Sequence, residues 1–133
     1  MPFRQDDPTI DDGALLWRCV HPDWIREQPD GSWRAGSNTF LDDLSGEVSY
    51  YIADETSVDA LRVSFPGWSI AQIDAGFVRS LGYLVARDPD GGGPGHVVVC
   101  PKPEENKSGK RKIKDARRIA DQARWIVLDK EQG

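Results

Sequence analysis

The sequence has 133 residues, enough for one domain with its own core and too few for two. It carries 22 acidic and 17 basic side chains, and no apolar run approaches the roughly eighteen residues that a membrane-spanning helix needs. These properties exclude a multidomain enzyme and a helical membrane protein. Because Met1–Asp12 is acidic where a signal peptide would be basic, we expect a soluble cytoplasmic protein.

The first part of the chain predicts a lead-in followed by a strand. Residues 1–13 are polar and contain four Asp, which indicates a flexible segment. Leu15–Val20 is apolar except for Arg18 and predicts a strand that ends before Pro22. We expect a single domain over residues 14–128 and a tail over residues 129–133.

The next segments predict a hairpin, a strand and a short helix. Trp24–Arg34 contains the turn Pro29-Asp30-Gly31, which suits a hairpin. The β-rich run Glu47–Ala53 predicts a strand that pairs with an earlier one. A helix is predicted to begin at Thr56, because Thr56-x-x-Asp59 resembles a capping box, and to end at Phe65-Pro66-Gly67.

Two patterns compete in Ser69–Leu81, which suits either a helix or two strands joined by a turn. Gly76 and Gly82 favour the two strands. Tyr83–Arg87 and His96–Cys100 are short apolar runs that predict a second hairpin. The Gly-rich loop between them is predicted to lack regular structure and to serve as a lid or a linker.

The last predicted helix is basic and has Ser108 as its N-cap. An apolar stripe of small and branched residues runs along it: Ile113, Ala116, Ile119, Ala120 and Ala123. Trp125–Leu128 predicts a strand or the end of a helix. Together these patterns predict an α+β fold, mainly an antiparallel or mixed sheet, with one or two short helices and the C-terminal basic helix.

Charge is distributed very unevenly along the chain. Lys107–Arg124 holds eight Lys and Arg against two Asp, whereas the rest holds nine against twenty. This asymmetry predicts a nucleic acid or an acidic protein as partner, contacted through Lys112, Lys114, Arg117 and Arg118. The alternative is that the helix only neutralises the acidic remainder of its own domain.

Both histidines lie where strands meet loops. His21 follows the first strand and His96 follows the Gly-rich loop. Such positions suit acid-base catalysis on a phosphoester or glycosidic bond if the two imidazoles share a cleft. The alternative is that each histidine fills a hydrogen-bonding position at a strand end.

Four further side chains are candidates for binding an anion or a nucleotide. Arg18 and Arg34 provide guanidinium groups, and Ser37 lies in a small-residue turn that could cradle an anion. Tyr51 could stack on a base. We expect no metal site, because no metal-binding motif is present, and we expect Cys19 and Cys100 to be reduced core thiols.

The order of several motifs resembles a group of short bacterial proteins of unassigned function. The residues that carry this resemblance are Leu16-Trp17-Arg18-x-x-His21-Pro22, Trp33-Arg34-x-x-Ser37-x-x-Phe40, Ser49, His96 and Trp125. Leu16–Leu61 also resembles small ADP-ribosyltransferase-like domains of the RES toxin type. That resemblance implies NAD as cofactor, with Arg18 and Arg34 on its pyrophosphate and Tyr50 or Tyr51 beside its nicotinamide. The sequence departs from that type in offering His96 where an acidic residue is usual.

Two functional hypotheses follow from these features. The first is a phosphate- or nucleotide-directed protein, such as an ADP-ribosyltransferase-like or RNA-directed toxin, in which His21 and His96 exchange protons while Ser37 orients the ligand. The second is a non-catalytic adaptor that binds nucleic acid or an acidic partner through the basic helix.

Overall fold

The computed structural model describes residues 4–36, 39–40, 47–103 and 109–128 and shows an α+β fold. The strands are β1 (Leu15–Val20), β2 (Ile25–Glu27), β3 (Trp33–Ala35), β4 (Val48–Ile52), β5 (Ser69–Asp74), β6 (Tyr83–Arg87), β7 (His96–Pro101) and β8 (Arg124–Val127). The α-helices are α1 (Val58–Ser64), α2 (Ala75–Ser80), α3 (Pro89–Gly92) and α4 (Gly109–Gln122), and the 3-10 turns are η1 (Pro22–Trp24) and η3 (Ala53–Glu55). None of the helices in these ranges is long and apolar enough to cross a bilayer.

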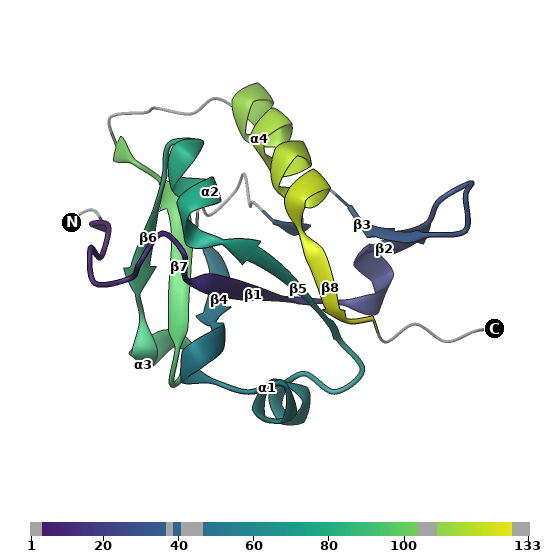
Figure 1. Ribbon diagram of the computed structural model, residues 1–133, viewed down its shortest axis with the longest axis horizontal. Coiled ribbons are helices and arrows are strands. Elements are labelled where there is room, and N and C mark those ends of the chain that lie inside the picture. Colours follow the sequence, from purple (N-terminus) through teal and green to yellow (C-terminus); the bar gives the residue numbers. More distant parts are fainter. Residues whose placement is uncertain (1–3, 37–38, 41–46, 104–108, 129–133) are drawn as a thin grey trace.

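Six strands form one antiparallel sheet in the order β6-β7-β4-β1-β5-β8, and β2 pairs with β3 as a separate hairpin (Figure 1). The predicted strand Leu15–Val20 is confirmed as β1 and lies inside the sheet. The predicted strand in Glu47–Ala53 is confirmed as β4, which pairs with β1 as expected and also with β7. β8 confirms the strand alternative for Trp125–Leu128.

Alternation along the strands divides the core into two layers. One face of the sheet packs against α2 and α4, with Leu16, Tyr50 and Ile119 among its buried residues. The other face packs against α1, with Cys19 and Tyr51 in its core. In Figure 1, α4 and α1 accordingly lie on opposite sides of the sheet.

Turn chemistry accounts for both predicted hairpins. Gly31 has a φ of 87°, and its amide donates to the Gln28 carbonyl, so the Pro29-Asp30-Gly31 turn joins β2 to β3 as predicted. The hairpin of β6 and β7 is also confirmed. Its loop contains the short helix α3, so the prediction that this loop lacks regular structure is wrong. Pro89 at the first turn of α3 suits a helix start.

The predicted short helix begins one residue later than its capping pattern suggested. Ser57, rather than Thr56, caps α1, and its Oγ accepts a hydrogen bond from the Ala60 amide at 3.1 Å. The helix ends as predicted before Phe65.

Ser69–Leu81 contains one strand and one helix, so each competing pattern was right over half of it. β5 takes the first half and α2 takes the second. Gly76 lies in α2, not in a turn, and its lack of a side chain suits its close contact with the N-terminal segment: a Cβ at Gly76 would be 3.0 Å from Asp12 Cβ. Its amide donates to the Asp12 carbonyl at 2.8 Å.

The predicted flexible lead-in differs from the structure over residues 4–13, which bind to β6 and α2. The Asp7 amide donates to the Val85 carbonyl, and Asp6 Oδ1 accepts from the Val85 amide, both at 2.9 Å. Arg79 of α2 contacts four acceptors in this segment, and Ile10 is buried. These bonds cover the outer edge of β6.

Candidate functional site

Arg18 projects from β1 toward the α4 face of the sheet, where it donates hydrogen bonds to backbone carbonyls. Its Nε donates to the Thr39 carbonyl at 2.8 Å, and one terminal nitrogen donates to the Ser49 carbonyl at 3.3 Å. The guanidinium carbon lies 5.4 Å from the ring centroid of Trp24. Arg18 therefore fastens the Thr39 segment to the sheet and stacks on an aromatic ring.

His21 contacts the same Trp24 ring as Arg18. The imidazole centroid is 5.6 Å from the Trp24 ring and 5.1 Å from the Trp68 ring. Nδ1 accepts a hydrogen bond from the Asp23 amide at 3.0 Å, which caps η1. This bond matches the expectation that His21 fills a hydrogen-bonding position at the strand end.

His96 occupies a different, buried environment. It pairs with Tyr51 across β4 and β7, and the two ring centroids are 5.3 Å apart. Nδ1 lies 2.6 Å from the Asp88 carbonyl oxygen. A carbonyl can only accept, so Nδ1 is the donor in this hydrogen bond.

Gly92 of the Gly-rich loop packs closely against both His96 and Tyr51. A Cβ at Gly92 would be 2.6 Å from His96 Cδ2 and 3.0 Å from the Tyr51 hydroxyl oxygen. Only glycine fits this approach without a displacement. The predicted lid is therefore a short helix that covers His96, whose exposed fraction is 4%.

The two imidazoles are separated by an aromatic chain instead of sharing a cleft. From His21 the chain runs through Trp68, then Phe65 at 5.0 Å and Tyr51 at 6.2 Å, to His96. The shared cleft required by the acid-base hypothesis is not formed in the described structure.

Arg34 lies elsewhere, between the β2–β3 hairpin and α4. Its guanidinium forms an ion pair with Asp121 of α4. Arg34 also lines a cavity of about 530 Å³, which we call the hairpin hollow. Ser37, the predicted orienting residue, lies outside the described residues.

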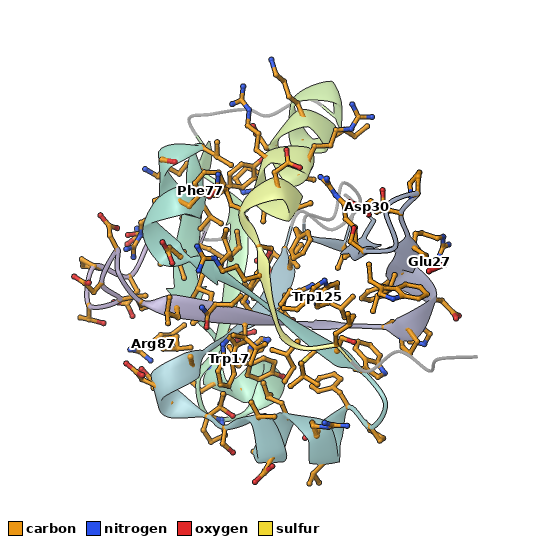
Figure 2. All side chains as sticks on the ribbon, turned by 45° about the vertical axis from the view of Figure 1, so that its right-hand side comes forward. Trp17, Glu27, Asp30, Phe77, Arg87 and Trp125 are labelled. Atoms are coloured by element: carbon orange, nitrogen blue, oxygen red, sulfur yellow. The ribbon has the colours of Figure 1, made fainter. Side chains whose placement is uncertain are left out.

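The hairpin hollow combines aromatic rings with guanidinium groups. Trp33 and Arg34 come from β3, and Arg124 and Trp125 from β8. Trp125 Nε1 donates to the Trp33 carbonyl at 3.0 Å, which holds the two strands together. Figure 2 shows Trp125 and Trp17 on opposite faces of the sheet, so Trp125 is on the α4 side. Ala120 and Ala123 leave room beside Trp125.

The four predicted partner-binding residues of α4 do not all share one face, because Lys112 lies apart from the others. Ala116 and Ile119 are buried against the sheet, and Asp115 accepts a hydrogen bond from the Tyr83 hydroxyl at 2.8 Å. Lys112 is half-buried on this same side, whereas the other predicted partner-binding residues are exposed: Lys114, Arg117 and Arg118.

The three exposed cations, at positions 114, 117 and 118, are spaced i, i+3 and i+4, so they share one face of α4. Arg117 precedes Ala120 and Asp121 by one turn and so lies toward the hairpin hollow. Lys114 and Arg118 lie farther around the helix. Of the predicted set, Arg117 is therefore the residue best placed beside the hollow.

A second cavity of about 560 Å³ lies on the α1 face, above Tyr51, and we call it the Tyr51 hollow. Its lining includes two carboxylates, Asp54 and Glu55, and no Lys or Arg among the described residues. Arg87 contacts both oxygens of Glu55, at 2.6 and 2.9 Å, and this hydrogen bonding lowers the pKa of Glu55. An anion would have no cation of the lining to bind.

The thiols and the acidic side chains offer no further site in the described ranges. Cys19 and Cys100 are free and buried in different clusters, and burial raises the pKa of each thiol to about 11. Those ranges contain no group of three or more His, Cys, Asp or Glu that could hold a metal ion.

Sequence reasoning did not assign Trp33, Arg124 or Trp125 as site residues. One signal was available: Trp33-Arg34 and Arg124-Trp125 each place a guanidinium next to an indole. Their meeting depends on the fold, because Trp33 and Trp125 are 92 positions apart.

A scan of protein-family models and searches of curated proteins and solved structures found no match to this chain. The candidate function therefore depends on the geometry of the two hollows.

Proposed function

We propose that this protein binds single-stranded nucleic acid at the hairpin hollow. The observation that carries the proposal is the presence of Trp33, Arg34, Arg124 and Trp125 around one cavity. Non-specific single-strand binders combine aromatic rings that stack on bases with cations that follow the backbone. Here a base would stack in the hollow and the adjoining phosphates would contact the guanidinium groups.

The electrostatics of the two hollows favour this location for an anionic ligand. The hairpin hollow has Arg34 and Arg124 in its lining together with one carboxylate, Asp30, and Arg117 lies beside it, so cations are in excess. The Tyr51 hollow has carboxylates and no cation in its described lining. Guanidinium groups bind phosphate through two parallel hydrogen bonds and stack on aromatic rings.

Binding is better supported than NAD-dependent transfer. The transferase expectation needs Arg18 and Arg34 on one pyrophosphate. Arg34 lines the hairpin hollow, whereas Arg18 does not line it and donates to two backbone carbonyls. The binding proposal needs neither histidine as a catalyst.

Tryptophan fluorescence during titration with a single-stranded oligothymidylate tests the proposal. We expect quenching at low salt and a dissociation constant that rises with salt concentration. Trp125→Leu keeps an apolar side chain but removes the ring, and we expect roughly five- to hundredfold weaker binding. Because Trp125→Leu removes one of the fluorescent rings, its binding is measured by letting an unlabelled strand compete with a labelled strand of the same sequence.

Trp17→Leu is the matched control, because Trp17 is also half-buried but packs in the opposite layer of the core. Circular dichroism confirms that both variants are folded. Absence of binding at low salt, or equal affinity of the two variants, would refute the proposal. A preference for duplex over single strand would also refute it, because a paired base cannot enter the hollow.

A further inference from the structure

The Tyr51 hollow has features of a ligand site that the nucleic-acid proposal does not use. Tyr51 lines the cavity, yet its side chain is 7% exposed, and no hydrogen bond of its hydroxyl group occurs within the described residues. The hydroxyl oxygen keeps some accessible surface, so it can meet a molecule that enters the hollow. Burial also raises the pKa of Tyr51, so the phenol keeps its proton as a donor at neutral pH.

The surroundings of Tyr51 hold its ring in place. The His96 ring packs edge-on against it at 62°, and the Asp88 carbonyl fixes the orientation of His96. Phe65 packs on Tyr51 as well. The hydroxyl therefore has a fixed position before any ligand enters, which reduces the entropy lost on binding.

The rest of the lining offers both donors and acceptors. Ser57 Oγ accepts from the Ala60 amide and so retains its own proton to donate. Thr56 and Ser64 supply further hydroxyl groups, and Asp54 supplies a carboxylate that only accepts.

An apolar contact completes the lining. Leu61 and Pro94 provide carbon surface beside these polar groups. This lining matches a compound with adjacent hydroxyl groups on a carbon skeleton. Each ligand hydroxyl can both donate and accept a hydrogen bond, and the carbon skeleton can contact the apolar surface.

Charge disfavours anionic and cationic ligands. An anion would face the Asp54 carboxylate, and the described lining has no cation to offset it. A cation would gain little binding free energy. Arg87 already forms hydrogen bonds with both oxygens of Glu55, and the other carboxylate, Asp54, is exposed to solvent.

We propose that the Tyr51 hollow binds a neutral polyhydroxyl compound of the size of a monosaccharide, with the Tyr51 hydroxyl as its central hydrogen-bonding group. The cavity of about 560 Å³ lies within the range of small-molecule sites.

Two-dimensional NMR titration of the full chain with D-ribose and D-glucose at millimolar concentrations tests this site, with putrescine and inorganic phosphate in parallel. We expect saturable shifts from at least one sugar, confined to β4, η3 and α1. Tyr51→Phe removes only the hydroxyl, and we expect it to weaken that binding about three- to tenfold.

Tyr50→Phe is the matched control, because Tyr50 immediately precedes Tyr51 in β4 but projects into the opposite layer, where its hydroxyl donates to the Phe40 carbonyl at 2.9 Å. The proposal fails if neither sugar causes saturable shifts, if putrescine or phosphate binds there more tightly, or if the two variants behave alike. Oligothymidylate binding is expected to be the same in both tyrosine variants, so failure here is distinguishable from failure of the nucleic-acid proposal.

Discussion

Asp121→Asn is expected to tighten binding of single-stranded nucleic acid. Asp121 of α4 forms an ion pair with Arg34 at the hairpin hollow, and both side chains are substantially exposed, at 59% and 44%. A phosphate that binds Arg34 has to approach this carboxylate. Removing the carboxylate charge eliminates the repulsion and releases the guanidinium group.

The expected size of this effect follows from Coulomb's law. A phosphate on Arg34 would lie roughly 6 Å from the Asp121 carboxylate, and in water this repulsion is about 0.7 kcal/mol. Its removal corresponds to about threefold tighter binding at low salt. Folding stability changes by less than about 1 kcal/mol, because exposed ion pairs contribute little.

Fluorescence titration with oligothymidylate at several salt concentrations measures the change. Arg34→Gln provides the opposite perturbation and is expected to weaken binding and reduce its salt dependence. Asp23→Asn removes an exposed carboxylate that does not line the hollow, so it controls for net charge. If Asp121→Asn weakens binding, or if Asp23→Asn has the same effect, the assignment of phosphate to Arg34 is refuted.

Three further predictions concern the stability of the fold. Arg79→Lys is expected to lower the free energy of unfolding by about 2–3 kcal/mol in urea titrations, because lysine cannot reach all four acceptors of the N-terminal segment; an unchanged midpoint would contradict that anchoring. Gly92→Ala is expected to cost about 1–3 kcal/mol and to shift the NMR signals of the His96 ring, since the new methyl group would be 2.6 Å from Cδ2; unperturbed His96 signals would show that the contact is absent. The Cys19 thiol binds its proton more tightly in the folded state, with a pKa raised from 9.0 to about 11, so its contribution to stability is lost as the pH rises through this window. Cys19→Ala should therefore lose less stability than the parent protein between those pH values, and equal losses would argue against the raised pKa.

Local patterns in the sequence were sufficient to predict most secondary structure. The apolar run Leu15–Val20, the Pro29-Asp30-Gly31 turn and the apolar stripe of the last helix each depend on neighbours only a few residues away. They predicted β1, the β2–β3 hairpin and α4, and the uneven charge was also evident. Ser69–Leu81 was ambiguous because its local pattern suits both periods, and the contact of Gly76 with Asp12, 64 positions away, cannot be read from that pattern.

The candidate sites required the tertiary structure. Arg34 pairs with a residue 87 positions away, and Trp125 binds a carbonyl 92 positions away, so no local pattern could place them around one cavity. The same long-range packing keeps His21 and His96 apart, anchors the N-terminal segment and leaves the Tyr51 hydroxyl facing a hollow. Secondary structure follows from interactions between near neighbours, whereas a binding site depends on which distant side chains the sheet order brings together.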